Sequence, residues 1–158
     1  MKLIAHSGPW ITDADTAAVE RVLRSRMLAQ GGVARELEQR LAGWVGMRDG
    51  VAVGSGSAAL TLAVMALGPC AGKEVIVPTY VCRSVREAVL SAGAQPVLCD
   101  SGPRWVIEAA AVKRLITPQT LCVIVPHLYG VFADVAAIRA LGVPVIEDCA
   151  QALAAEGE

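Results

Sequence analysis

Short apolar segments alternate with helical patterns along most of this chain, and this alternation limits the possible folds. Four segments, at 74–77, 96–100, 121–126 and 143–148, are apolar almost throughout instead of at every second residue. A strand with this pattern has to be covered on both of its faces. We therefore predict an α/β fold, a mainly parallel sheet with helices on both faces.

Helical patterns lie before these strands and between them. Thr12 and Asp15 form a candidate capping box ahead of a first helix, and Gly31-Gly32 breaks the pattern. A second helix is predicted over about 33–46, with apolar residues on one side. The remaining predicted elements are a short strand at 51–53 and helices near 57–67, 83–92, 107–116 and 133–141.

The composition argues against several classes of protein. Hydrophobic residues make up 54% of the 158 residues, enough for a sizeable core in one domain. The net charge of −1 gives no electrostatic case for binding nucleic acid or an anionic membrane surface. No apolar run approaches the ~20 residues of a transmembrane helix, and the N-terminus makes a poor signal peptide. We expect a cytoplasmic protein.

The cysteines and histidines suggest neither disulfides nor a metal centre. There are five cysteines, an odd number, and no pair has CxxC spacing. This pattern predicts small buried thiols in a reducing compartment. The two histidines, His6 and His127, form no pair with ligand spacing, so no metal site is expected.

Most of the notable polar and aromatic residues in the second half follow a predicted strand directly. Tyr80 and Cys82 follow 74–77, His127 follows 121–126, and Asp148 ends the last strand. In open α/β sheets, ligands bind outside the carboxyl ends of the strands. We therefore expect a ligand site at this edge. His127 would either contact the ligand or satisfy backbone groups there, and Tyr80 would pack or line the site.

The stretch VAVGSGSAAL, residues 51–60, places small residues between an apolar run and a helix. Gly54 and Gly56 allow a tight turn, and Ser57 offers a hydroxyl beside the positive end of a helix. The turn is either a phosphate cradle or a simple helix cap. It lacks the GKS/T of a P-loop, and Ala59 stands where a dinucleotide fingerprint has its third glycine. NAD binding is therefore disfavoured.

Asp148 comes at the end of an apolar strand, where a buried carboxylate without a partner would be costly. It would therefore pair with a cation, such as a protonated ring nitrogen, or serve as a structural cap. A phosphate cradle combined with a carboxylate for a ring nitrogen suggests pyridoxal phosphate (PLP) as the ligand.

The blocks VAVGSGSAAL, EVIVPTYVCRSV, GAQPVLCD, VPHLYG and VPVIEDCAQALAAE occur in this order along almost the whole chain. With them the chain resembles the PLP-dependent sugar aminotransferases of the DegT/StrS type, which belong to the fold-type-I aminotransferases. The resemblance implies a PLP-dependent aminotransferase that acts on a keto-sugar nucleotide in amino-sugar biosynthesis. It also implies an amino donor such as glutamate, and a homodimer.

The resemblance also implies roles for individual residues. Ser57 and the amide of Ala58 would hold the cofactor phosphate, with Gly56 in the same turn. Asp148 would bond the pyridine nitrogen and keep it protonated, so that the ring acts as an electron sink.

Further roles follow from the same resemblance. Gln151 would contact the ring hydroxyl of the cofactor. Cys82 stands at the position of the residue that stacks on the ring, where many members have an aromatic side chain. Tyr80 and His127 would line the site.

The Schiff-base lysine of the family has no counterpart here, since Lys2, Lys73 and Lys113 do not match its position. We expect that lysine beyond Glu158. Residues 1–158 would then be the N-terminal portion of the PLP-binding large domain, truncated and without the C-terminal small domain. Such a chain would be inactive alone. Two alternatives stay open: a non-catalytic binding or interaction half of a split or decayed enzyme, and a related PLP sugar dehydratase.

Overall fold

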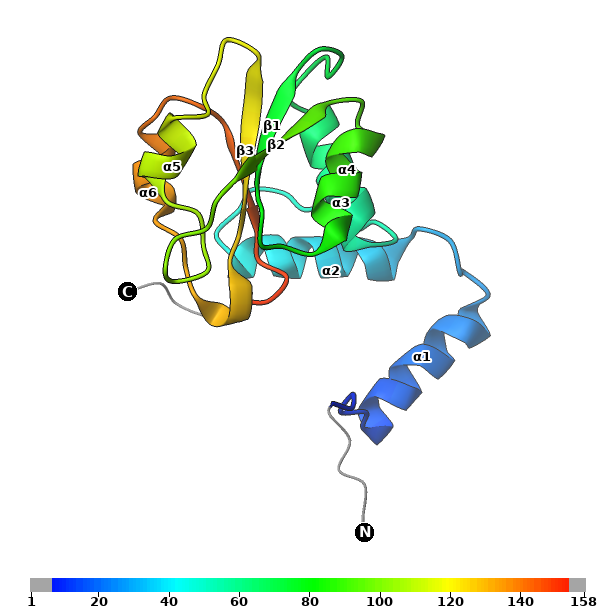
Figure 1. Ribbon diagram of the computed structural model, residues 1–158. Helices are drawn as coiled ribbons and strands as arrows, with labels where there is room; N and C mark the ends of the chain where they lie inside the picture. The colour runs from blue at the N-terminus through cyan, green and yellow to red at the C-terminus, as the bar shows by residue number, and fades with distance from the viewer. Residues whose placement is uncertain (1–6, 154–158) are drawn as a thin grey trace. The chain divides into compact units, whose positions relative to one another are not determined.

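The computed structural model of the chain (Figure 1) describes residues 7–153. These divide into two compact units. The first unit ends at Ala52 and the second begins at Val53. The first unit contains two helices, α1 (Asp13–Ser25) and α2 (Gly32–Trp44).

Helix α1 begins with the predicted capping box. The hydroxyl of Thr12 accepts a hydrogen bond from the N–H of Asp15, and the carboxylate of Asp15 accepts one from the N–H of Thr12 at 2.8 Å. The side-chain and backbone hydrogen bonds from Thr12 lower the pKa of Asp15. Arg26 takes up the left-handed conformation that ends the helix.

The second unit is built on four parallel strands in the order β2-β1-β3-β4. The predicted parallel sheet is therefore confirmed. The predicted strand at 51–53 is not formed, because these residues pair with none of the strands in the described part of the chain. The strands are β1 (Glu74–Pro78), β2 (Gln95–Cys99), β3 (Thr120–Pro126) and β4 (Val145–Asp148).

Helices cover both faces of this sheet, as predicted (Figure 1). One face carries α3 (Gly56–Met65) and α4 (Arg83–Ser91). The other carries α5 (Ala109–Lys113) and α6 (Val135–Arg139), which are shorter than the predicted helices at 107–116 and 133–141. A single 3₁₀ turn, η1 (Leu128–Gly130), follows β3. Within residues 7–153, no helix has both the length and the apolar character needed to cross a bilayer.

The central strand β3 shows why the strands are apolar throughout. Cys122 and Ile124 point into the core beneath α3 and α4, whereas Val123 and Val125 point into the core beneath α5 and α6. All four are completely buried. Successive side chains of a strand face opposite ways, so a sheet covered on both sides requires an apolar residue at every position.

The chain leaves the middle of the sheet in two opposite directions. From β1 it passes through α4 to β2 at one edge, and from β3 it passes through α6 to β4 at the other. Such a switch point opens a crevice at the carboxyl ends of the two strands. Both strands also end on a proline, Pro78 and Pro126, which has no N–H to continue the hydrogen-bond ladder.

The two-sided core leads to a stability prediction. Replacing the fully buried Ile124 with Ala should lower the free energy of unfolding by about 2–5 kcal/mol, because a cavity opens in a packed core. Leu98 in β2 is 54% exposed, and we expect Leu98→Ala to cost less than about 1 kcal/mol. Urea denaturation measures both, and equal losses would contradict this description of the core.

Candidate functional site

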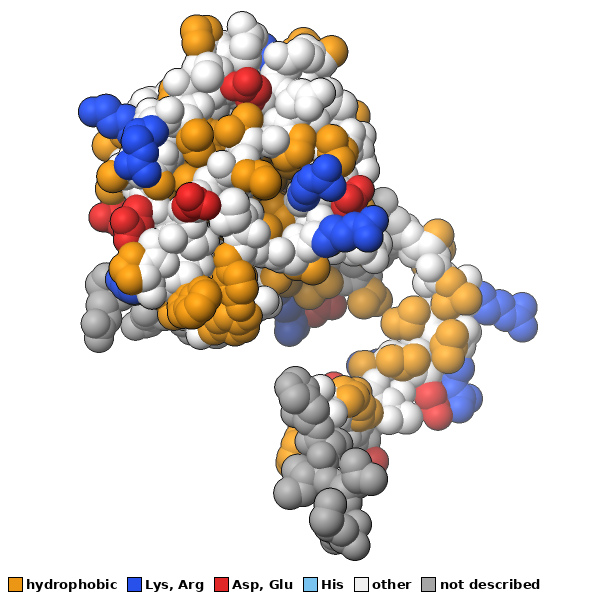
Figure 2. Space-filling view, viewed as in Figure 1, with side chains coloured by type: hydrophobic (Ala, Val, Ile, Leu, Met, Phe, Trp, Pro, Cys, Tyr) orange, Lys and Arg blue, Asp and Glu red, His pale blue; other side chains and the backbone are white. Residues whose placement is uncertain are grey.

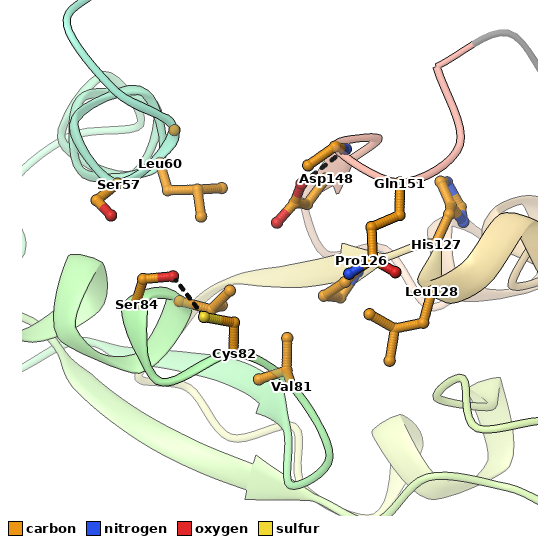
Figure 3. Close-up of a pocket in the computed structure, with 13 residues that line it drawn as sticks. Ser57, Leu60, Val81, Cys82, Ser84, Pro126, His127, Leu128, Asp148 and Gln151 are labelled. Carbon is orange, nitrogen blue, oxygen red and sulfur yellow. Dashed lines mark hydrogen bonds between the residues drawn. The ribbon is translucent and has the colours of Figure 1, made fainter. Parts of the chain in front are cut away.

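A pocket of about 320 Å³ lies at the switch point, at the carboxyl edge of the sheet (Figure 3). The start of α3, the β1–α4 loop and the ends of β3 and β4 surround it. Its volume falls at the lower end of the ~300–1,000 Å³ typical of small-molecule sites. The pocket-lining residues that the sequence had singled out are Gly56, Ser57, Cys82, His127, Asp148 and Gln151.

The start of α3 supplies the positive side of the pocket. The first N–H groups of a helix have no acceptor within the helix, and the helix dipole adds to their charge. A Cβ built onto Gly56 meets no atom within 4 Å, so open space adjoins the backbone there. Ser57 places its hydroxyl at the same helix end (Figure 3). This arrangement suits a bound anion.

Ser55, to which the sequence pattern assigned no role, is the N-cap of α3. Its hydroxyl accepts a hydrogen bond from the N–H of Ala58 at 3.1 Å. The Ala58 amide is therefore engaged within the turn and does not line the pocket. A serine three residues before that amide, at the start of a helix, is a recognisable capping signal. The phosphate-cradle and helix-cap interpretations are thus compatible here, because Ser55 caps the helix and Ser57 faces the pocket.

Asp148 lies at the end of β4, on the other side of the pocket from Ser57 (Figure 3). One of its carboxylate oxygens accepts a hydrogen bond from the N–H of Ala150 at 3.1 Å. Strand β3 fixes the backbone of Asp148. Asp148 pairs with Pro126, and its carbonyl oxygen accepts a hydrogen bond from the N–H of His127 at 3.0 Å. The pocket therefore has a positive helix end on one side and a carboxylate on the other.

Cys82 lines the pocket with an exposed thiol, so the prediction of a buried cysteine is wrong at this position. The hydroxyl of Ser84 donates a hydrogen bond to its sulfur at 3.2 Å. This bond and one from the Ser84 backbone lower the pKa of Cys82, while slight desolvation and the charge of Asp148 act in the opposite direction. The prediction of burial is confirmed for Cys70, Cys99 and Cys122.

Gln151 and Tyr80 take different places at this edge. The side-chain oxygen of Gln151 accepts a hydrogen bond from the N–H of Tyr129 at 2.9 Å, which leaves its NH₂ group available to a ligand. Tyr80 stands next to the pocket-lining Val81 but does not line the pocket itself. Its hydroxyl lies 3.2 Å from the hydroxyl of Tyr129.

His127 borders the pocket, yet its side chain is completely buried and points away from Ser57 and Cys82 (Figure 3). Its Nδ1 accepts a hydrogen bond from the N–H of Ala133 at 3.3 Å, so its proton is assigned to Nε2. That nitrogen lies 3.2 Å from Glu147. Of the two interpretations left open by the sequence, the imidazole follows the second and satisfies groups at the sheet edge.

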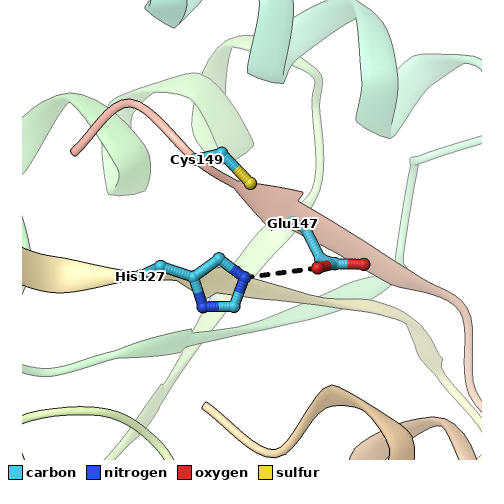
Figure 4. A group of neighbouring side chains, drawn as sticks. All are labelled: His127, Glu147 and Cys149. Atoms are coloured by element: carbon cyan, nitrogen blue, oxygen red, sulfur yellow. Dashed lines mark hydrogen bonds and ion pairs between the residues drawn. The ribbon is translucent and has the colours of Figure 1, made fainter. Parts of the chain in front are cut away.

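Three potential metal ligands, His127, Glu147 and Cys149, lie within 4.8 Å of one another (Figure 4). Their chemistry favours hydrogen bonding over metal binding. Nε2 carries a proton directed at Glu147, and Arg139 already pairs with the same carboxylate at 2.8 Å. Burial, followed by the charges of Glu147 and Asp148, raises the pKa of Cys149, whereas a metal needs the thiolate.

Comparison with known proteins shows which family the chain belongs to. The sequence pattern of the DegT/DnrJ/EryC1/StrS aminotransferase family matches residues 9–158. A relative from Acidithiobacillus ferrooxidans, UDP-N-acetyl-3-dehydro-alpha-D-glucosamine 3-aminotransferase, is 41% identical over 98% of this chain and 43% of its own length.

Two solved structures are similar as well. The aminotransferase from Psychrobacter cryohalolentis matches with a TM-score of 0.86 and 34% identity, over 91% of this chain and 38% of that one. A Streptococcus pneumoniae protein solved in its PLP form matches with a TM-score of 0.83 and 29% identity, over 87% of this chain and 36% of that one. The chain thus spans less than half the length of these proteins.

The exposures and pKa directions of the cysteines lead to a labelling prediction. Iodoacetamide should modify Cys82 first. The pH at which its labelling reaches half of the maximal rate should be lower than for an ordinary thiol, because the thiolate of Cys82 forms more readily. Ser84→Ala removes the donor, so the pKa should rise and the pH profile should shift upward. Cys122, whose pKa burial raises to about 12, should stay unlabelled while the protein is folded. Peptide mapping by mass spectrometry measures all three, and early labelling of Cys122 would contradict the structure.

Proposed function

Because the chain belongs to the DegT/DnrJ/EryC1/StrS aminotransferase family, we propose that it provides the cofactor-binding part of a PLP-dependent aminotransferase acting on a keto-sugar nucleotide. The observation that carries the proposal is the pocket with a positive helix end and Ser57 on one side and Asp148 on the other. In this proposal, residues 1–158 form the N-terminal portion of the large domain.

The residues of the pocket fit PLP chemically. When bound, PLP supplies a ring that accepts electron density from the substrate. The start of α3 would receive its phosphate, since the open space beside Gly56 lets an oxygen approach the backbone N–H groups. Asp148 would accept a hydrogen bond from the protonated ring nitrogen and stabilise that protonation by its charge.

Two further residues would orient the ring. Cys82 offers a small polarizable sulfur to the ring face, which gives less contact area than an aromatic side chain. Gln151 would donate from its NH₂ group to the ring oxygen. The hydrogen bond from the N–H of Tyr129 to the side-chain oxygen of Gln151 restrains this amide and leaves its NH₂ group as the donor.

None of the residues that line the pocket in the described chain is a lysine. Lys73 precedes β1 and so lies at the amino edge, about 16 Å from the carboxyl edge for five residues at ~3.3 Å each. Lys113 ends α5, and Lys2 lies outside the described residues. Covalent attachment of the cofactor in this pocket therefore requires an amine other than Lys73 or Lys113.

The substrate class rests on the similarity to the A. ferrooxidans relative, whose name specifies a UDP-linked 3-dehydro sugar. A nucleotide-linked keto sugar is accordingly the proposed acceptor of the amino group. The amino donor such as glutamate, the homodimer and the cytoplasmic location stay predictions from the sequence. The two alternatives, a non-catalytic binding half and a PLP sugar dehydratase, have no observation in their favour beyond those already stated.

Graded substitutions at Ser57 test the phosphate cradle. Ser57→Ala should weaken PLP binding by removing one hydrogen bond, and Ser57→Asp should weaken it further, by at least ~10-fold, through added charge repulsion. Ser7→Asp introduces the same charge at an exposed position in the first unit and should leave binding unchanged. Absorbance titration with PLP measures the affinities. Equal affinity of all three variants would remove the cradle from the proposal.

The positions of the lysines lead to a second test. After incubation with PLP and reduction with borohydride, the lysines of this chain should carry only scattered, substoichiometric label, and the chain alone should show no amino transfer. The physical reason is that neither described lysine reaches the pocket edge. Mass spectrometry locates the label. Stoichiometric labelling of one lysine together with amino transfer to a keto-sugar nucleotide would contradict this part of the proposal.

A further inference from the structure

Three exposed aromatic rings follow three neighbouring strands at the carboxyl edge of the sheet. Trp105 comes after β2, Tyr80 after β1 and Tyr129 after β3, so their order follows the order of the strands. They are 57%, 45% and 69% exposed, respectively. Figure 2 shows hydrophobic side chains gathered at this lower edge of the second unit. We call these three residues the aromatic row, and such a patch is typical of a binding surface.

Tyr80, in the middle of the aromatic row, contacts both of the other members. The ring centroids of Tyr80 and Trp105 are 5.0 Å apart, and the two planes are tilted by 48°. On its other side, Tyr80 places its hydroxyl 3.2 Å from that of Tyr129. The row is therefore arranged before any ligand arrives, which lowers the entropic cost of binding.

Two members of the row have unfavourable backbone conformations. Trp105 has a φ of 68° and Tyr129 a φ of 56°, in the left-handed region that bulky residues rarely adopt. A tight turn holds Trp105, whose N–H donates to Gly102 O at 3.0 Å, and Gln151 holds the N–H of Tyr129. Strained positions of this kind cluster at ligand-binding sites. The strain and the exposure are independent observations, and both point to a ligand.

The row continues the pocket sideways along the sheet edge. Tyr80 precedes the pocket-lining Val81, and Tyr129 follows the pocket-lining Leu128. The distance along the sheet edge from the pocket at β3 to β2, the strand before Trp105, is about two strand spacings, or ~10 Å. A ligand that reaches both places must be elongated, with a planar group at the end away from the pocket.

A cation stands beside the row. Arg104 is exposed, and its guanidinium lies 3.4 Å from the carbonyl oxygen of Phe132, next to the turn that carries Trp105. This single hydrogen bond leaves other N–H groups of the guanidinium free for a phosphate. A planar aromatic group joined through phosphate to a sugar is the chemistry of a nucleotide sugar.

We propose that the aromatic row is the base-binding subsite of the protein, with the nucleobase stacked on Trp105 and Tyr80 and the diphosphate beside Arg104. This inference rests on the proposed function, because it places the sugar end of the same substrate in the pocket. Stacking on aromatic rings suits any base, since every base has a π face. The row therefore provides affinity for the nucleotide, and the pocket selects the sugar.

Calorimetric titration with UDP, UMP and ribose 5-phosphate tests the proposal. Trp105→Asn removes the ring with a residue that tolerates a positive φ, and it should weaken UDP and UMP binding by at least ~5-fold. Ribose 5-phosphate, which lacks the base, should bind equally to both proteins. Trp105→Phe keeps a ring and should retain most of the affinity. Trp44→Asn, at an exposed tryptophan of α2, is the matched control and should bind UDP normally.

The outcomes separate this inference from the proposed function, because PLP binding is titrated on the same unmodified protein. If Trp105→Asn remains folded and binds UDP as tightly as the unmodified chain, the stacking proposal is wrong and the nucleotide-sugar substrate stands. If the unmodified chain binds PLP but not UDP, both the stacking and the nucleotide substrate are wrong, and the aminotransferase assignment stands. If Trp105→Asn changes only the sedimentation behaviour, the row is a contact between copies of the chain and the proposal fails.

Discussion

The parallel pairing of β3 with β4 is the constraint on which the site depends. It aligns Pro126 with Asp148, and the N–H of His127 closes the end of the ladder on the carbonyl of Asp148. Because all four strands run the same way, everything that follows a strand collects at one edge. The pocket, Cys82 and the aromatic row all follow from this single arrangement. A slip of β4 by one residue would turn Asp148 to the opposite face and leave the pocket without its carboxylate.

Hydrogen bonds of Glu147 and His127 hold the end of β4 in place beside the pocket. Glu147 receives a hydrogen bond from the buried imidazole of His127 and one from Arg139 on α6. The same imidazole accepts a hydrogen bond from the N–H of Ala133. Together these bonds connect the segment after η1 to the end of β4. His127 thus connects the turn that carries Tyr129 to the strand that carries Asp148. Its role in this structure is to position its neighbours, since its ring does not face the pocket.

The sequence predicts much of this fold, because its strongest signals are local. Continuous apolar runs predicted the covered parallel sheet, and the spacing of Thr12 and Asp15 predicted the cap of α1. Some predictions differ from the structure because they depended on contacts between distant residues, and others differ for a local reason. Residues 51–53 have strand-like composition, but a strand requires a neighbour. The direction of the His127 ring, which the sequence left open, is set by hydrogen bonds with Glu147 and Ala133. Cys82 is exposed because the loop after β1 places it beside the pocket, and its own sequence context does not show this. The amide of Ala58 has a local competitor for its N–H, the hydroxyl of Ser55 three residues earlier.

The sheet divides the core into two clusters, and each cluster contains a buried cysteine that can report local unfolding. Cys122 lies in the core beneath α3 and α4, and Cys99 lies in the core beneath α5 and α6. Both are fully buried free thiols, so each becomes reactive only when its own side of the sheet opens. The chain therefore carries a natural probe on each side. Comparing the protection of the two thiols under native conditions would show whether the two layers of helices separate from the sheet cooperatively or one at a time.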